Sequence, residues 1–424
     1  MPRNEPTEVT EEWDGGRSAR RRKAVRYAVP VAVAGVTAAT IGLVPAFAGS
    51  GSPDLPKISA QDLIAKIAKS DVQQLSGTVQ VTTDLGLPAL PGGAGAGALG
   101  GGKGGDGAGA AASPQSKLTE LASGTHTLRV AADGPDKQRV SIVGKSADYT
   151  LVHNGADVWS YDSGSNSAVH HTAPKDARRG AHRGAPEGLP DGLQNATPQE
   201  LAKEVLKAAG DTTSVTVGDT ARVAGRDAYQ LVIKPKQAAS TVGSIRVAVD
   251  AANGVPLKFT LTPKSGGPAA VDVGYTRVDF ARPAADTFAF TPPKGAKVVN
   301  GDRAAHGKGE GGEGLGGFGG FGGFKGHQGP KGAGGFEVLG KGWTSIAALK
   351  APGGPGGSGG KDQLAKGDAG KFLDSLGSKV SGTFGSGHVF STRLVNALIT
   401  DDGRVYVGAV DQQALIAAAD AAKK

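Results

Sequence analysis

Short stretches of alternating apolar and polar residues dominate the middle of the chain, from Thr125 to Val299. Alternate residues of a strand point to the same face, so this pattern is typical of strands with one buried and one solvated face. Asn154-Gly155 and Asn253-Gly254 suit the positive φ angles of tight turns, and such turns join antiparallel strands. The pattern therefore predicts a curved antiparallel sheet. Its expected strands read THTLRV, QRVSIV, ADYTLVH, ADVWSYD, AVHHT, YQLVIKP, SIRVAVD, PLKFTLT and VDVGYTRVDF.

Two segments have the three- and four-residue spacing of apolar residues that is typical of amphipathic helices. The first, Ile58 to Leu75, has Ser59 as its expected N-cap and leads into an alternating stretch, Ser76 to Leu85. The second, Thr197 to Ala209, opens on a capping residue followed by a proline suited to the first helical turn. Two helices are too few to cover both faces of such a sheet, so we expect both to lie across one concave face.

Glycine-rich tracts divide the chain into units. Many of its 70 glycines lie in 92–112, which shows no periodicity, and in 301–335, where Phe318, Phe321 and Phe324 are spaced through glycines. Such tracts bury too little apolar surface to fold, so we expect a flexible loop insertion and a linker there. Residues 57–300 are then the main domain, and 336–424 are a small α+β appendage. In the appendage, KFLDSL and the segment that starts at Gln412 have the pattern of helices.

The N-terminus carries a targeting signal. Residues 1–26 are polar, basic and expected to be disordered on the cytoplasmic side. They precede Tyr27 to Ala48, which carries no charge and is long enough to cross a bilayer as a helix. The positive-inside rule places everything after this segment outside the cytoplasm. Because the segment ends in Ala46-Phe47-Ala48, the A-x-A pattern of signal peptidase sites, the sequence leaves two outcomes open. The chain is either anchored in the cell membrane by a single span or secreted after cleavage near Ala48.

Groups that carry catalysis or bind metals do not form a recognisable set. His170 and His171 are adjacent on an expected strand and so point to opposite faces, and no carboxylate is suitably spaced beside His153. The absence of cysteine excludes disulfides, thiol nucleophiles and zinc–thiolate sites. The net charge of +8 is partly concentrated before the apolar segment and does not indicate nucleic-acid binding. We therefore expect a protein that is not an enzyme and has no cofactor, metal or nucleic-acid partner.

Three stretches resemble segments of the LolA-like lipoprotein carrier superfamily. LVHNGADVWSYDSGSNSAVHH is similar to the family's turn, aromatic strand and return strand. Asp227 to Thr262 resembles the family's middle strands, and Thr287 to Val299 (TFAFTPPKGAKVV) resembles its closing F-x-F-x-P-P-x-G motif. The order and spacing of these stretches match the family over residues 58–299. The same family includes MucB/RseB-type regulators and LppX/LprG-type lipid-binding lipoproteins, and the Ala- and Gly-rich composition is typical of an actinobacterial member.

The resemblance implies an α+β fold in which a curved antiparallel sheet forms an incomplete β-barrel, with helices as a lid over an apolar cavity for acyl chains. Burying hydrocarbon contributes about 0.8 kcal/mol per methylene, so such a cavity needs no reactive group. Alternation alone does not fix which set of side chains faces inward. The residues expected to line the cavity are Leu128, Leu151, Trp159, Tyr161, Leu231, Ile233, Val247, Phe259 and Leu261. The residues expected in the lid are Leu63, Ile64, Ile67, Leu201 and Val205.

The same observations favour a carrier of lipids or lipidated proteins that acts outside the cytoplasm without bond chemistry. Its expected partners are a lipid or lipidated protein, the membrane, and a membrane-bound regulator or transporter. Two alternatives remain open. The fold would equally serve an RseB-like sensor that regulates a membrane partner such as an anti-sigma factor, or a structural scaffold of the cell envelope.

Overall fold

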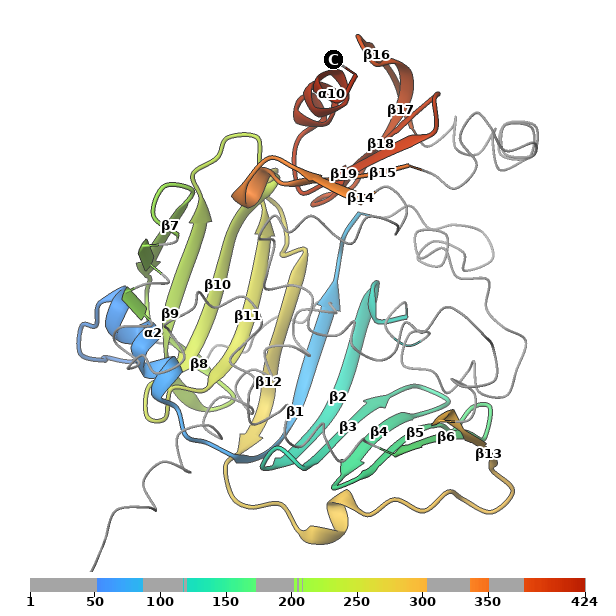
Figure 1. The fold of residues 1–424 in the computed structure, drawn as a ribbon. Coiled ribbons are helices and arrows are strands. Elements are labelled where there is room, and N and C mark those ends of the chain that lie inside the picture. The colour runs from blue at the N-terminus through green and yellow to red at the C-terminus, as the bar shows by residue number, and fades with distance from the viewer. Residues whose placement is uncertain are drawn as a thin grey trace, which may run out of the picture.

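The computed structural model describes residues 52–86, 120–172, 209–302, 336–350 and 377–423, together with 117, 202, 203, 206 and 207. This part of the chain is mostly β (Figure 1). It contains a curved 13-stranded sheet, a separate six-stranded sheet and two α-helices, and neither sheet closes into a barrel. The predicted targeting segment 27–48, the glycine-rich insertion 92–112 and the helix-like KFLDSL lie outside the described residues, as does most of the predicted linker 301–335.

All the strands expected from alternation are confirmed in the large sheet. Its order is β13-β6-β5-β4-β3-β2-β1-β12-β11-β10-β9-β7. The short strand β8 lies outside this order and pairs with β9. The strands are β1 (Gln74–Thr83), β2 (Gly124–Asp133), β3 (Lys137–Val143), β4 (Tyr149–Asn154), β5 (Asp157–Asp162), β6 (Ser167–Thr172), β7 (Thr213–Val217), β8 (Ala221–Val223), β9 (Arg226–Pro235), β10 (Val242–Asp250), β11 (Pro256–Pro263), β12 (Val271–Asp279) and β13 (Lys297–Asn300).

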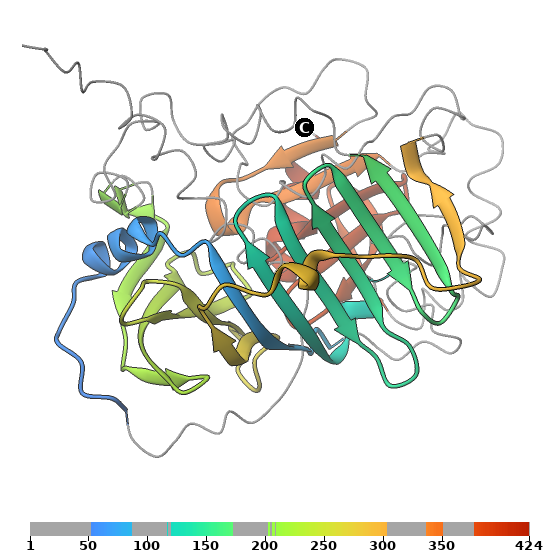
Figure 2. The same cartoon turned by 90° about the horizontal axis from the view of Figure 1, so that it is seen from below.

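Two features correct the predicted fold class. The described chain is mostly β rather than α+β, because two α-helices accompany 19 strands. The large sheet is mixed rather than antiparallel, since β13 pairs in parallel with β6. The chain reaches this position by crossing the sheet from the end of β12, through the short 3₁₀ helix η4 (Ala285–Phe288), as Figure 2 shows. The alternation of apolar and polar residues within a single strand does not indicate such a crossing.

The first predicted helix is confirmed but shorter than expected. It is α2 (Ala60–Lys69), and the Ser59 hydroxyl accepts a hydrogen bond from the Asp62 backbone N–H at 3.1 Å, which caps the helix as predicted. Lys66 and Lys69 lie in the last turn, where positive charge is favourable. The helix ends before Leu75 because that residue belongs to β1 and is fully buried in the main core.

A glycine fixes the approach of α2 to the large sheet. Gly254, in the turn between β10 and β11, has a φ of 78°, and a Cβ added there would lie 2.5 Å from the Lys66 carbonyl oxygen. Gly225 has the same φ of 78° but no atom within 4 Å of an added Cβ.

We expect Gly225→Ala to lower the free energy of unfolding by about 1 kcal/mol, the cost of a left-handed conformation. Gly254→Ala should cost about 2 kcal/mol more, because the helix must also move away. Urea denaturation of both variants measures the difference, and equal losses would contradict the contact.

The six-stranded sheet forms the C-terminal unit with the helix α10 (Gln412–Ala421), which the sequence predicts from Gln412. Asp411 caps this helix by accepting a hydrogen bond from the Ala414 N–H at 2.9 Å. Leu415 and Ala419 are fully buried against one face of the sheet. The strand order is β14-β15-β19-β18-β17-β16. These strands are β14 (Phe336–Leu339), β15 (Ile346–Lys350), β16 (Ser378–Gly382), β17 (Gly385–Ser391), β18 (Asn396–Thr400) and β19 (Arg404–Gly408).

Specific contacts join the C-terminal unit to one end of the large sheet. The Arg393 guanidinium donates to the carboxylate of Asp84 at 2.5 Å and to its carbonyl at 3.0 Å. The indole N–H of Trp343 donates to the Thr213 hydroxyl at 2.8 Å. Leu394 is buried between the two sheets. The two units therefore share a packed interface as well as polar contacts.

Candidate functional site: an apolar face of the large sheet

One face of the large sheet is apolar across six strands. Residues directly opposite each other in a strand register share a face, so the pairings place whole rows of side chains together. One row contains Val217, Leu231, Val247, Phe259, Val273 and Val81. The next contains Val215, Ile233, Ile245, Leu261 and Val271. We call this surface the apolar face.

The apolar face continues from β1 into β2, β3 and β4. Val79 lies two residues from Val81 on β1 and is opposite Leu128. That row continues through Ile142 and Tyr149. A parallel row contains Val130, Val140 and Leu151. The structure therefore places seven of the expected cavity residues on one face: Leu128, Leu151, Leu231, Ile233, Val247, Phe259 and Leu261.

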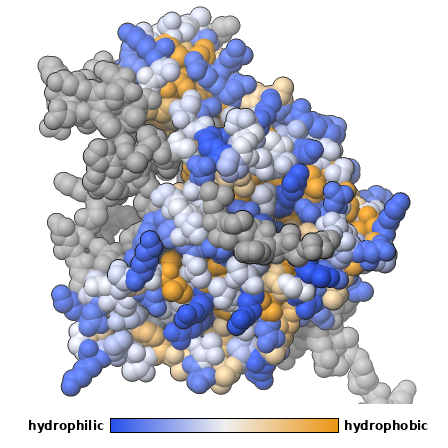
Figure 3. Space-filling view, turned by 180° about the vertical axis from the view of Figure 1, so that it is seen from behind, coloured by the Kyte–Doolittle hydropathy of each residue, from blue (hydrophilic) through white to orange (hydrophobic). Residues whose placement is uncertain are grey.

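The opposite face of the same strands is polar. Lys258 and Asp272 form an ion pair at 3.0 Å on it, and the hydroxyls of Ser141 and Thr150 are 3.0 Å apart. Other residues of this face are Gln80, Thr82, Thr127, Arg129 and Thr260. A sheet with one apolar and one polar face buries the apolar one. From behind the view of Figure 1, the described surface shows hydrophilic residues with smaller hydrophobic groups between them (Figure 3).

Helix α2 covers one edge of the apolar face. Leu63 is fully buried among Tyr229, Leu231 and Val249, and Ile64 and Ile67 are half-buried in the same cluster. The expected lid residues of α2 therefore pack on the strands β9 and β10. The other expected lid residues, Leu201 and Val205, lie outside the described residues, although their described neighbours 202, 203, 206, 207 and 209 are helical.

The C-terminal unit covers one end of the apolar face. Leu394, Trp343 and Ala409 form a cluster with the three side chains Ile245, Leu261 and Val271 of that face. Between this end and α2, Phe259 and Val247 are half-buried. The apolar face is thus bordered by protein on two sides. In its middle row Leu231, Val273 and Val81 are buried, whereas Val247 and Phe259 keep part of their surface exposed.

Trp159 and Tyr161 lie on the opposite face from the other expected cavity residues. The register pairs their neighbour Ser160 with Leu151 of the apolar face, so both aromatic rings point away from it. Trp159 stacks on His170 with ring centres 4.2 Å apart. Both aromatic side chains also meet Phe290, at 5.5 and 5.7 Å, on the segment that crosses the sheet from β12 to β13. Their contacts hold this segment against the sheet.

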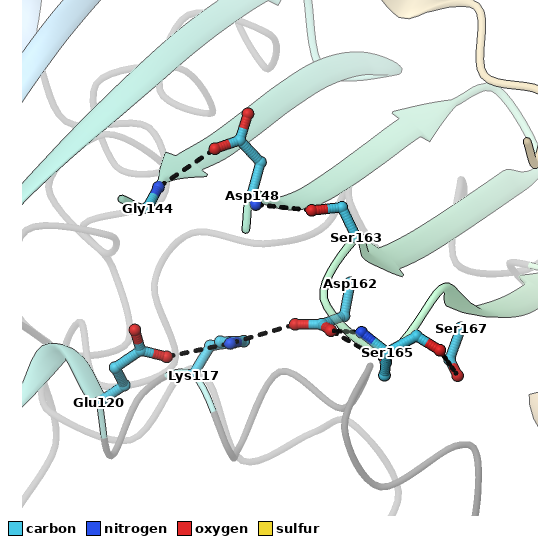
Figure 4. A network of polar contacts seen from close by, with 8 residues as sticks. All are labelled: Lys117, Glu120, Gly144, Asp148, Asp162, Ser163, Ser165 and Ser167. Carbon is cyan, nitrogen blue, oxygen red and sulfur yellow. Dashed lines mark hydrogen bonds and ion pairs between the residues drawn. The ribbon is translucent and has the colours of Figure 1, made fainter. Parts of the chain in front are cut away.

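A polar network borders the apolar face where β5 ends (Figure 4). The Lys117 ammonium lies 3.1 Å from the buried carboxylate of Asp162 and 3.0 Å from Glu120. Burial raises the pKa of Asp162, but hydrogen bonds from Ser165 and the charge of Lys117 outweigh burial and leave the pKa below its ordinary value. Burial raises the pKa of the neighbouring Tyr149 to about 12, so this phenol stays neutral. The network ties the segment before β2 to this end of the sheet.

Tyr275 is a residue of the apolar face that sequence reasoning missed. It lies opposite Val79, and its ring packs over Gly77, where an added Cβ would be 2.9 Å from the ring. Its hydroxyl is buried and has no hydrogen-bond partner in the described part of the chain. Burial raises its pKa well above the ordinary value. The alternating stretch VDVGYTRVDF indicated a strand, but only the register with β1 shows which face Tyr275 occupies.

A second concave site lies in the C-terminal unit and has no counterpart in the sequence analysis. It is a groove of about 840 Å³ between α10 and the strands β14 and β15. Leu339, Ile346 and Ala348 form its floor on the sheet, and Glu337 and Arg404 supply charge. Its helical wall consists of Ala414, Ala417, Ala418, Ala421 and Ala422.

The described residues contain no group of three or more His, Asp or Glu side chains arranged to hold a metal ion. Among these same residues, no helix has both the length and the apolar character needed to cross a membrane.

Comparisons with known proteins show distant structural similarity to MucB and to LolA-superfamily proteins. The MucA/MucB complex of Pseudomonas aeruginosa matches with 14% identity and a TM-score of 0.36, covering 85% of this chain and 96% of the other. A LolA-superfamily protein from Nitrosomonas europaea matches with 11% identity and a TM-score of 0.21, covering 55% and 99%. An uncharacterised conserved protein from Thermus thermophilus matches with 14% identity and a TM-score of 0.30, covering 57% and 98%. No family model and no curated protein matches the sequence.

Proposed function

We propose that this protein binds an acyl chain of a lipid or lipidated protein on the apolar face and carries it outside the cytoplasm. The observation that supports the proposal most strongly is the continuous apolar surface from β7 to β4, on which Phe259 and Val247 are only half-buried although their row neighbours Val273 and Val81 are buried. Apolar side chains that stay partly exposed on such a surface are unfavourable in water, and exposed apolar patches are typical of binding sites. Its lining of aliphatic and aromatic side chains is suited to hydrocarbon.

Transfer of the ligand's acyl chain from water to the apolar face provides enough free energy for binding. Burying ten methylenes contributes about 8 kcal/mol, which corresponds to a dissociation constant of about 1 μM before other costs. The neighbouring polar groups would orient the ligand without reacting with it. The apolar targeting segment 27–48 supports a location outside the cytoplasm.

The dependence of affinity on acyl-chain length tests this proposal. Each added methylene should tighten the binding of saturated fatty acids by up to about fourfold until the apolar face is filled. Displacement of a fluorescent fatty acid by chains of increasing length measures this dependence. Affinity that does not change with chain length would contradict the proposal.

A second candidate function is a sensor that regulates a membrane-bound protein. The groove between α10 and β15 favours it, because this concave surface is separate from the apolar face and so provides a place for a protein partner. The expected observation is a stoichiometric complex with a membrane protein. If the complex forms equally well with and without lipid, the chain serves as a binding protein rather than as a carrier.

A further inference from the structure

Tyr275 carries a buried polar group that has no partner in the described part of the chain. Its side chain is 6% exposed, and its hydroxyl makes no hydrogen bond to any described residue. Most buried polar groups of folded proteins have such a partner, so an exception needs a physical reason. A phenylalanine would fill almost the same space without the cost of burying a hydroxyl. The hydroxyl of Tyr275 therefore contributes nothing to folding that the ring alone would not provide.

Two other buried tyrosines of the large sheet show the ordinary arrangement. The hydroxyl of Tyr229 donates a hydrogen bond to the Pro56 carbonyl oxygen at 3.0 Å. The hydroxyl of Tyr149 is hydrogen-bonded to Ser160. Burial raises the pKa of Tyr275 well above its ordinary value, so this phenol keeps its proton at neutral pH. Tyr275 thus presents a permanent hydrogen-bond donor that no described residue accepts from.

Two local features fix the position of Tyr275. The register places it opposite Val79, and the next pair along the strands is Arg277 with Thr78. Strand β12 therefore has one extra residue at this point, which is a β-bulge. Bulges re-aim neighbouring side chains and are frequent beside functional sites. Gly77 leaves room for the ring, since an added Cβ would lie 2.9 Å from it.

The partly exposed side chains of the apolar face lie one row away from Tyr275. Tyr275 is two residues from Val273 on β12, and Val273 is the register partner of the half-buried Phe259. Diagonal neighbours on adjacent strands are about 7–8 Å apart, which is within reach of long side chains. A ligand that packs on Phe259 would therefore extend to the surroundings of the Tyr275 ring.

We propose that the Tyr275 hydroxyl donates a hydrogen bond to the carbonyl oxygen of an acyl ester or amide bound on the apolar face. This inference rests on the proposed function and specifies the polar group of its ligand. A carbonyl oxygen accepts a hydrogen bond and carries no charge, so it can be buried beside the phenol. An ionised carboxylate there would have no cation to pair with, because the neighbours Gly77, Val79 and Val273 supply none. Binding moves aside the side chains that cover the hydroxyl and gives it an acceptor.

Tyr275→Phe in the full-length protein tests this hydrogen bond, because the substitution removes one oxygen and keeps the ring. Displacement of a fluorescent fatty acid measures the affinities for methyl dodecanoate, which has a carbonyl, and for tetradecane, which has none. The variant should bind the ester about fivefold more weakly than the natural chain does, the loss expected for one hydrogen bond. Its affinity for the alkane should not change.

The matched control is Tyr229→Phe, which removes a buried hydroxyl that already has a partner. In urea denaturation without ligand, Tyr275→Phe should raise the midpoint, because an unsatisfied buried group is lost. Tyr229→Phe should lower the midpoint, because the Pro56 carbonyl loses its donor. This control should also leave the ratio of the two affinities unchanged.

Two results would overturn this inference and leave the proposed function intact. One is an equal change in the affinities of Tyr275→Phe for the ester and the alkane. The other is a lower midpoint for Tyr275→Phe, which would show that the hydroxyl already has a partner without ligand. If the natural chain binds neither the ester nor the alkane, the proposed function fails together with this inference.

Discussion

Replacing Phe259 with aspartate is expected to weaken acyl-chain binding by at least about 100-fold. Phe259 lies between Val247 and Val273 in the middle row of the apolar face and is half-buried, so its side chain would border the bound hydrocarbon. A carboxylate there must lose water when the ligand arrives, and none of its row neighbours carries a compensating charge. A cost of about 3 kcal/mol is moderate for burying a polar group without a partner, and it corresponds to this loss of affinity.

Two further variants make this result specific to the apolar face. Thr216→Asp introduces the same charge on the exposed side of β7, between Val215 and Val217, and should leave affinity unchanged. Phe259→Leu keeps the apolar surface and should lose less than tenfold. Displacement titrations measure all three variants, and melting temperatures show whether each remains folded. Equal affinities of the Phe259→Asp and Thr216→Asp variants for the ligand would show that the apolar face is not the binding site.

Asp250→Ala is expected to cause the largest loss of stability, about 3 kcal/mol. The Asp250 carboxylate is 1% exposed and forms an ion pair with Arg226. It also accepts hydrogen bonds from the N–H groups of Ala252 at 2.8 Å and Asn253 at 3.1 Å. Removing one member of a buried pair leaves its partners without compensation. Because the Arg226 side chain is one-third exposed and can reach water, the loss should lie at the low end for such pairs.

The control is Asp227→Ala, which removes a neighbouring but exposed ion pair with Arg222. Exposed pairs contribute little, so its cost should stay below about 1 kcal/mol. Urea denaturation of the two variants at neutral pH measures the difference. Similar losses would show that Asp250 has no special role in the turn after β10.

The contribution of Asp250 should also depend on pH. Burial raises the pKa of Asp250, but the hydrogen bonds from Arg226 and from the backbone, with the charge of Arg226, outweigh burial and hold the pKa below 3.8. A lowered pKa means that the stabilisation is present above pH 3.8 and is lost as the pH falls below it. The difference in stability between the natural chain and Asp250→Ala should therefore shrink in acid.

The strands and their one-sided burial could be predicted from the sequence because both depend on local alternation. SIRVAVD and PLKFTLT became β10 and β11, with Val247 and Phe259 on one face as expected. The helix caps at Ser59 and Asp411 involve only neighbouring residues. Of these two caps, Ser59 is the one predicted from the sequence.

Features that depend on pairing between distant strands were not predictable from alternation. Trp159 and Leu151 both belong to stretches in which apolar and polar residues alternate. Only the register between β4 and β5 shows that their side chains lie on opposite faces of the sheet. The parallel pairing of β13 with β6 depends on a long crossing segment. The groove beside α10 depends on the packing of a helix against β14 and β15, and the sequences of these two strands contain no motif that predicts a groove.

The mass of the natural protein tests the central claim most directly. The chain, purified without detergent from the cells that make it, is measured by native mass spectrometry before and after extraction with organic solvent. Our account predicts an additional mass equal to one acylated molecule before extraction, which disappears afterwards and is absent from the Phe259→Asp variant. Identical masses before and after extraction, in a protein that also fails to bind added fatty acids, would contradict it.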